Sequence, residues 1–335
     1  MKRYTLLDVF RLLCACLAVV IHLGTGPQTP IAGMVVTCFS RQTVPFFFMV
    51  SGFFFAGKLK KAEDPKCFVR TYAKRMLLLY GIWVLILLPQ TVIDYSQMYQ
   101  GRSWLYIAIL LARRILLAGL AQFWYILALA ETALIAGLIL ANGKQRILYG
   151  IAWIGFLSGM VYCAEIPAFR LYNQLIYTVF SWNCNFLMLG LPFFSAGIYF
   201  FEHQEKITLK TGTLVWAYWI DSAAAVVCYW ILKKAGIYPE RVILFYPIQA
   251  VLLFLIGIKS SMEPVSPKAA VVCRECSCAV YCLHNFVIEY ILGEVVPWSS
   301  HFAVNLLVVL SICIAAFCIV KALRITPVYR LITLK

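Results

Sequence analysis

Residues 6–23 read LLDVFRLLCACLAVVIHL, an apolar run whose only ionisable side chains, cysteine apart, are Asp8, Arg11 and His22. A helix needs about 17–25 mostly apolar residues to cross the hydrocarbon core of a bilayer, and this run has that length. The stretch therefore predicts a membrane-spanning helix near the start of the chain.

Further apolar runs with polar gaps between them follow along the whole sequence. The chain has 335 residues, of which 63% are hydrophobic and 13% charged, whereas a soluble domain carries about 25% charged residues. This composition excludes a soluble globular enzyme. It predicts an all-α polytopic membrane protein with about ten transmembrane helices, at residues 6–23, 44–56, 76–93, 123–140, 147–163, 185–201, 213–232, 242–258, 276–295 and 302–320.

One further apolar segment, residues 104–120, is split by Arg113 and Arg114 into runs too short to cross alone. With ten spans and a cytoplasmic N-terminus, 20 Lys and Arg residues lie inside and 8 outside, but if this segment crosses the tally becomes 13 against 13. Because basic residues collect in cytoplasmic loops, we expect ten spans, cytoplasmic N- and C-termini, and an amphipathic interfacial helix at 104–120. The net charge of +15 is then an orientation signal, and we expect no nucleic-acid partner.

The three ionisable residues of the first run share one face of the expected helix. Asp8 and Arg11 are three apart and can pair, and Arg11 and His22 are separated by about three full turns, roughly 16 Å along the axis. Each ionisable group inside a span costs about 2.5–3.5 kcal/mol, so such residues are functional candidates. The alternative is an interfacial ion pair with a hydrogen-bonded interhelical histidine.

These residue types suit acid–base and anion chemistry. Histidine can take a proton from a hydroxyl near neutral pH or act as a nucleophile, and arginine offers a fork of donors to phosphate or carboxylate oxygens. Glu131, Asp221 and Glu289 also fall in spans, where they either line the same cavity or are neutralised or paired interhelical residues. The run Cys273, Cys276, Cys278 and Cys282 fits no common metal-site spacing, so we expect no metal.

Several motifs occur in an order that resembles one known family. Arg11 and His22 form an Arg-x10-His pattern with Asp8 before it, residues 44–53 read VPFFFMVSGF with Ser51, and residues 123–127 read FWYIL with Trp124 and Tyr125. Residues 277–284 then give a Ser-x3-Tyr-x2-His pattern of Ser277, Tyr281 and His284, and residues 327–331 a terminal Pro-x2-Arg. Together these resemble the acyltransferase-3 family of integral membrane O-acyltransferases. One departure is the family's paired-arginine motif, because Arg70 and Arg75 here are five apart rather than three.

The resemblance implies a single transmembrane acyltransferase-like domain over residues 1–335, with no fused extracytoplasmic domain, in the cell (plasma) membrane. It implies that acetyl-CoA or another acyl-CoA is the co-substrate and that the acyl group, most often acetyl, passes to a hydroxyl of a cell-surface or cell-envelope carbohydrate. His22 would be general base or acyl carrier, Asp8 would orient Arg11, and Arg11 would hold a donor phosphate or carbonyl oxygen. The expected binding residues are Ser51, Arg75, Trp124, Tyr125, Ser277, Tyr281 and His284.

The expected partners are acyl-CoA, the carbohydrate acceptor and membrane lipids, and the chain either acylates the acceptor directly or works with a separate extracytoplasmic transferase. The basic stretch 58–75 suits the phosphates of coenzyme A, or else is ordinary cytoplasmic charge against anionic lipid. The main alternative function is a transporter or exporter of a small polar substrate or glycan intermediate, and another is a non-catalytic scaffold.

Overall fold

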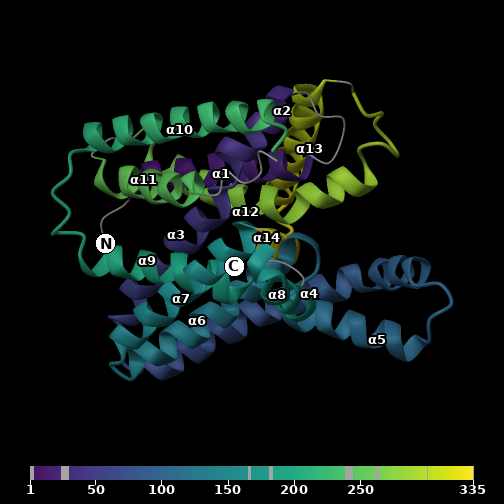
Figure 1. Cartoon of the computed structure of the whole chain (residues 1–335), viewed down its shortest axis with the longest axis horizontal. Helices are drawn as coiled ribbons and strands as arrows, with labels where there is room; N and C mark the ends of the chain where they lie inside the picture. The colour runs from purple at the N-terminus through teal and green to yellow at the C-terminus, as the bar shows by residue number, and fades with distance from the viewer. Residues whose placement is uncertain are drawn as a thin grey trace. The chain divides into compact units, whose positions relative to one another are not determined.

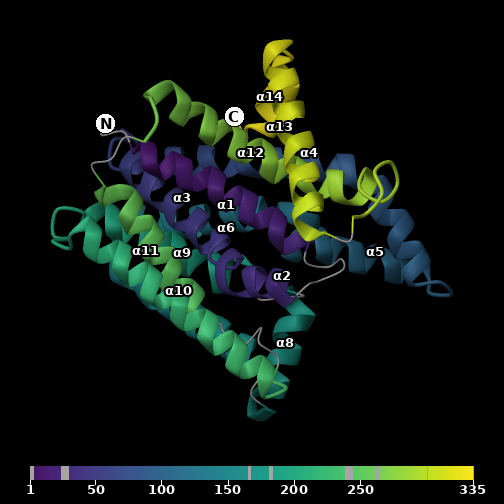
Figure 2. The ribbon, with the colours of Figure 1, turned by 90° about the horizontal axis from the view of Figure 1, so that it is seen from above.

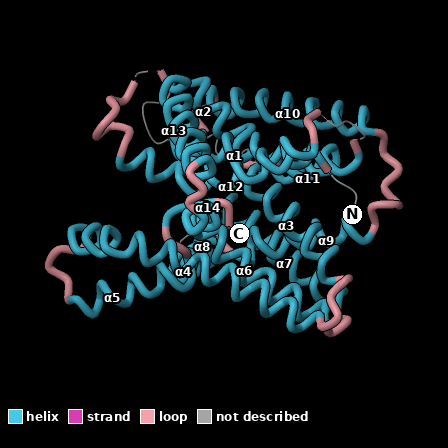
Figure 3. The backbone as a smooth tube through the Cα atoms, turned by 180° about the vertical axis from the view of Figure 1, so that it is seen from behind, coloured by secondary structure: helices cyan, strands magenta, loops and turns pink. Residues whose placement is uncertain are grey.

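The computed structural model describes residues 4–23, 30–164, 167–180, 184–237, 244–260, 264–299 and 301–334. Within these ranges every regular element is a helix, and the single β-type contact is an isolated bridge between Leu292 and Val296 (Figures 1 and 3). The prediction of an all-α protein is confirmed.

The chain divides into two compact units. The first comprises Met1–Phe47 and Glu205–Lys335, and the second comprises Phe48–Gln204. The chain passes from the first unit to the second within α3 (Thr43–Leu59).

The first unit holds the two ends of the chain. α1 lies against α12, α10 runs beside α11, and α13 contacts both α12 and α14 (Figures 1 and 2). Its elements are α1 (Thr5–Leu23), α2 (Pro30–Val35), the π-helical η1 (Val36–Ser40), α10 (Thr211–Lys234), α11 (Phe245–Lys259), α12 (Pro267–Tyr290), α13 (Phe302–Ala322) and α14 (Thr326–Ile332).

The second unit is built around two helix pairs, α4 with α6 and α7 with α9. Besides the greater part of α3 it contains α4 (Pro65–Met98), α5 (Trp104–Arg113), η2 (Arg114–Ala118), η3 (Ala121–Phe123), α6 (Trp124–Ala141), α7 (Gln145–Ala164), η4 (Pro167–Phe169), α8 (Arg170–Phe180), η5 (Phe186–Gly190) and α9 (Leu191–Glu202).

In the described part of the chain, eight helical segments are long and apolar enough to cross a membrane, and two shorter apolar helices, Phe186–Glu202 and Phe245–Lys259, accompany them. Each of the ten predicted spans corresponds to one of these segments. The protein is therefore a multi-pass membrane protein. The eight long segments are Thr5–Leu23, Pro30–Leu59, Pro65–Met98, Ala121–Ala141, Gln145–Ala164, Thr211–Lys234, Pro267–Tyr290 and Phe302–Ala322.

Two helices begin well before the apolar runs that predicted them. α4 starts at Pro65, where the Cys67 amide donates to the Asp64 carboxylate at 3.0 Å. α12 starts at Pro267, where the Ala269 amide donates to the Ser266 hydroxyl at 3.3 Å. Each start therefore combines a side-chain N-cap with a proline in the first turn. Much of the basic stretch expected as a loop at 58–75 is consequently helical.

Two glycines in the second unit allow α3 and α9 to approach closely. A Cβ atom added at Gly52 would collide with the backbone carbonyl of Phe194, and one added at Gly197 would collide with that of Met49. Small residues at such crossings let the backbones of membrane helices meet, and packing rather than the hydrophobic effect holds them together.

We expect Gly52→Ala to lower the stability of the detergent-solubilised protein by about 1–3 kcal/mol, because backbone atoms cannot move aside as a flexible side chain can. Gly150→Ala in α7 is the matched control, since no atom lies within 4 Å of its added Cβ. The measurement is the thermal midpoint of each variant. An equal midpoint for Gly52→Ala and Gly150→Ala would contradict the close approach.

Candidate functional site

The site begins with the pairing of α1 and α12, which run in the same direction. Near their N-terminal ends a guanidinium nitrogen of Arg274 lies 3.8 Å from a carboxylate oxygen of Asp8. Near their C-terminal ends the rings of His22 and His284 have centroids 4.9 Å apart. Figure 2 shows the two helices side by side. Polar residues from both helices therefore meet at two levels along one shared seam.

The parallel direction of α1 and α12 also bears on the number of spans. Two helices that cross a bilayer in the same direction have an odd number of crossings between them along the chain. Among the described residues, five candidate spans and the two shorter apolar helices lie between α1 and α12 in the sequence, which makes seven crossings if each of them crosses. A further crossing at 104–118 would make the number even. The segment formed by α5 and η2 is also not among the candidate spans of the described residues. The ten-span count thus agrees with the packing.

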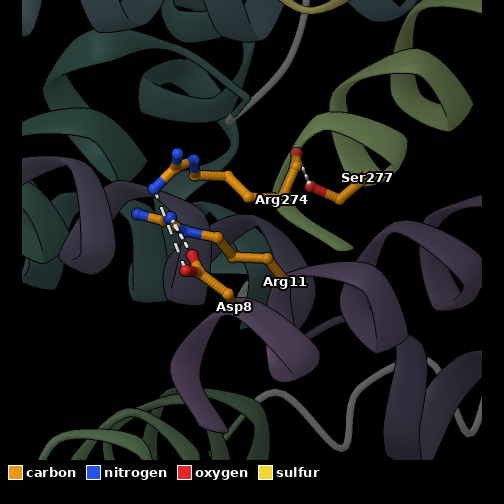
Figure 4. Close-up of polar contacts among 4 residues, drawn as sticks. All are labelled: Asp8, Arg11, Arg274 and Ser277. Atoms are coloured by element: carbon orange, nitrogen blue, oxygen red, sulfur yellow. Dashed lines mark hydrogen bonds and ion pairs between the residues drawn. The ribbon is translucent and has the colours of Figure 1, made fainter. Parts of the chain in front are cut away.

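The first level of the seam is a charge cluster of Asp8, Arg11 and Arg274 (Figure 4). The Arg11 guanidinium donates to the Asp8 carboxylate at 2.5 Å, and only 13% of the Arg11 side chain and 14% of the Asp8 side chain are exposed. Arg274 approaches the other carboxylate oxygen and is 44% exposed. Two guanidinium groups share one carboxylate, so the cluster presents excess positive charge, which suits an anionic group.

Arg274 was not among the predicted site residues. The predicted span begins at residue 276, two residues after Arg274. Arg274, Ser277, Tyr281 and His284 are spaced 3, 4 and 3 residues apart, which places them on one face of α12. The Ser277 hydroxyl donates to the Arg274 carbonyl at 2.8 Å, within the same helix (Figure 4). Extending the predicted helix upstream by two residues, from 276 to 274, would have added Arg274 to the face that carries Ser277.

The second level of the seam is the histidine pair. His284 is buried, with 1% of its surface exposed. Its Nδ1 lies 2.8 Å from the Tyr281 carbonyl and 3.0 Å from the Val280 carbonyl. Because carbonyl oxygens only accept, Nδ1 carries the proton and Nε2 carries the lone pair. The His22 ring is tilted by 52° against that of His284. The centroids of the Tyr281 and His284 rings are 6.4 Å apart.

The second unit, described by itself, gathers three other predicted residues. The hydroxyls of Ser51 on α3 and Tyr125 on α6 lie 3.2 Å apart, and the rings of Trp124 and Tyr125 are 6.4 Å apart. Phe48 packs on Tyr125 with ring centroids 4.7 Å apart. Arg75 lies on the N-terminal part of α4 with an exposed side chain.

An ion pair between a buried carboxylate and an exposed lysine, which sequence reasoning missed, links α12 to α13. Glu275 is paired with Lys321 at 3.2 Å, and its carboxylate side chain is 6% exposed. Burial and this carboxylate raise the pKa of Tyr329, on α14, to about 12. α14, which carries the terminal Pro-x2-Arg pattern, also contacts α12.

The cysteine run of α12 consists of free thiols. Among the residues that the structure describes, no three His, Cys, Asp or Glu side chains are grouped so that they could hold a metal ion. The groups that meet at the two levels of the seam include the guanidinium, carboxylate and imidazole groups described above.

Two curated relatives of this chain are amino-acid racemases of Enterococcus faecalis. One is 26% identical over 221 residues, which is 62% of this chain and 30% of the relative. The other is 22% identical over 330 residues, which is 90% of this chain and 44% of the relative. The chain thus spans less than half the length of either relative. No solved structure matches it.

A family described as an acyltransferase domain, acyltransferase-3, matches residues 4–324. The match includes the charge cluster and the histidine pair of the seam and extends over nearly the whole chain. The protein belongs to the acyltransferase-3 family.

Proposed function

We propose that the protein transfers an acyl group, foremost acetyl, from acyl-CoA to a hydroxyl of a cell-surface or cell-envelope carbohydrate. Membership of an acyltransferase family supports acyl transfer as the reaction. The observation that carries the finer assignment is the seam, which combines a cationic cluster with an imidazole pair on α1 and α12. An acyl-CoA has the matching parts, since its phosphates are anionic and its thioester needs a base or a nucleophile.

The spacing along α1 fits such a donor. Arg11 and His22 are about 16 Å apart along the helix axis, a distance that a pantetheine arm can bridge. In this arrangement Asp8 orients Arg11, and Arg11 holds a donor phosphate or carbonyl oxygen by charge-assisted hydrogen bonds. The thioester then reaches the level of His22.

With His22 as general base, its unprotonated ring nitrogen takes the proton of the acceptor hydroxyl. The hydroxyl oxygen bonds to the thioester carbonyl carbon and the carbon–sulfur bond breaks. The departing thiolate then takes the proton from the imidazolium. With His22 as acyl carrier, its nitrogen attacks the same carbon first, the carbon–sulfur bond breaks and CoA leaves as the thiolate. The acceptor oxygen then bonds to that carbon and displaces the imidazole, and the hydroxyl proton passes to the thiolate. Acid–base catalysis of this kind contributes about 10²–10⁴-fold to a rate.

The other expected site residues take binding roles in this proposal. Ser277, Tyr281 and His284 line the seam on α12, and Ser51, Trp124 and Tyr125 bind the donor or the acceptor within the second unit. Arg75 contacts donor phosphate. The remaining assignments are a plasma-membrane location with cytoplasmic termini, and a carbohydrate acceptor that is acylated directly or through a separate extracytoplasmic transferase.

The racemase name belongs to the much longer relatives, and we do not extend it to this chain.

Arg274→Ala is expected to raise the KM for acyl-CoA by about 10–100-fold, because a hydrogen bond to a charged group is worth about 1.5–3 kcal/mol. It leaves kcat nearly unchanged, since Arg274 is remote from the histidine pair. Lys268→Ala, an exposed position in the first turn of the same helix, is the matched control. Steady-state rates at varied acyl-CoA measure both constants, and an unaltered KM for Arg274→Ala would remove Arg274 from donor binding.

The proposed function is tested with purified protein in proteoliposomes, with acetyl-labelled acetyl-CoA and envelope glycans as acceptors. Label recovered as an ester on the glycan supports acyl transfer. A parallel arm measures uptake of labelled sugars without any acyl donor, and uptake without transfer would support the transporter instead. Mass spectrometry of surface glycans from a deletion strain then identifies the acceptor by the ester that is lost.

A further inference from the structure

His284 is an unusual residue to find at the centre of a helix pair in a membrane protein. The residue is 1% exposed, and the ring of His22 lies against it with 4.9 Å between the ring centroids. Packing alone does not explain two imidazole rings in contact, because polar groups within a membrane span cost free energy.

The hydrogen bonds of His284 fix the state of its ring. Nδ1 donates to the carbonyls of Val280 and Tyr281, one turn back on the same helix. Nε2 is fully buried and has no hydrogen-bond partner among the residues that the structure describes. A neutral ring with a proton on Nδ1 has an acceptor at Nε2. A buried acceptor without a partner is disfavoured, so a donor for it is to be expected during function.

We infer that His284 is a positioning residue for His22: its Nε2 accepts the N–H of the His22 ring. This inference rests on the proposed function of His22. The centroid separation is short enough for an N–H···N hydrogen bond once the two rings turn edge to edge. Fixing the N–H of His22 on the side of His284 leaves the lone pair of its other nitrogen facing away from His284, available to a substrate.

The inferred hydrogen bond orients and stabilises His22 at each stage of the transfer, and no proton passes to His284. When His22 takes the proton of the acceptor hydroxyl it becomes an imidazolium, and one of its two N–H groups points at Nε2 of His284. The lone pair of Nε2 stabilises that cation inside the apolar helix pair. When the proton passes to the departing thiolate, His22 returns to the same neutral tautomer. His284 keeps its own proton on Nδ1 throughout.

Two substitutions separate positioning from mere packing. Asparagine places a polar atom near the position of Nδ1, so His284→Asn keeps a bond to the backbone carbonyls but lacks an atom at the position of Nε2. Glutamine places its amide near the position of Nε2, so the carbonyl oxygen in His284→Gln can accept the N–H of His22. A structural role predicts that Asn is tolerated better than Gln, and the positioning role predicts the reverse.

The test is nitrogen NMR of the full chain in nanodiscs, with ¹⁵N-labelled histidine, in mildly alkaline buffer. The chain has four histidines, so single substitutions assign the signals of His22. We expect one tautomer of His22 in the wild type and in His284→Gln, and a mixture of both tautomers in His284→Asn. The same mixture in wild type and His284→Asn, or a single tautomer in both, would overturn the inference.

Transfer rates provide the second arm. We expect His284→Asn to lower kcat by about 10-fold or more and to change the KM for acyl-CoA much less. His284→Gln is expected to recover much of the loss in kcat. Full activity of His284→Asn would overturn the inference even if His22 is catalytic. If the wild type transfers no acyl group at all, the proposed function fails, while the NMR result still decides whether His284 holds His22.

Discussion

His22→Ala is expected to lower the rate of acyl transfer by about 10²–10⁴-fold, the range that a positioned acid–base group contributes. The loss should appear in kcat, since His22 acts on the reacting atoms, while acyl-CoA is held mainly at the charge cluster about 16 Å away. The other charged residues of α1, Asp8 and Arg11, are already paired with each other.

The control for this variant is His301→Ala. His301 is exposed, precedes α13, and makes no capping bond through its side chain. Both variants are purified and compared at equal amounts of folded protein. Retained transfer in His22→Ala at normal expression would remove His22 from the chemistry, and an equal loss in His301→Ala would show that the effect is not specific to the seam.

Asp8→Leu should be the most destabilising single change in the seam, with a loss of about 3–5 kcal/mol. Removing one partner of a buried ion pair leaves the other charge uncompensated. The Arg11 side chain is 13% exposed and has Arg274 beside it, so the two guanidinium groups would face each other without the carboxylate. Asp8→Asn, which keeps an acceptor oxygen but no charge, should lie between the wild type and Asp8→Leu.

The double variant Asp8→Leu/Arg11→Met tests the cause of that loss. It removes both charges together, and replacing a buried pair by apolar residues is often neutral for stability. We expect its thermal midpoint in detergent to return close to that of the wild type. We expect no acyl transfer from it, because the Arg11 guanidinium that holds the donor is gone. If Asp8→Leu is as stable as the wild type, the pair is a solvated interfacial one and Arg11 reaches water on its own.

Much of the fold follows from the sequence, because apolar runs long enough to cross a bilayer are a strong signal. Each predicted span has its counterpart among the helices of the structure. The largest errors lie at helix starts, as at Pro65 in α4 and Pro267 in α12, and smaller ones lie at the ends of the same helices, Met98 and Tyr290. The first turns of these helices carry charged residues, so each apolar run begins after its helix has begun. The N-caps at Asp64 and Ser266 were the better signal for the helix starts.

The site was predictable within single helices but not between them. The spacing along α1 placed Asp8, Arg11 and His22 on one face, and the Asp8–Arg11 pair is present as expected. That Arg274 reaches Asp8, and that His22 meets His284, depend on which helices pack together and in which direction. Helix pairing in a membrane is decided by contacts distant in sequence, and the periodicity of one helix does not contain them.

The central claim is that the seam of α1 and α12 carries acyl transfer, and sealed proteoliposomes test it most directly. Acetyl-labelled acetyl-CoA is supplied to wild type and His22→Ala with the acceptor glycan, and alkali-labile label on the glycan is counted. We predict label with the wild type and a loss of about 10²-fold or more with His22→Ala. Equal labelling by the two proteins, or acceptor that crosses the bilayer unlabelled with both, would contradict the account.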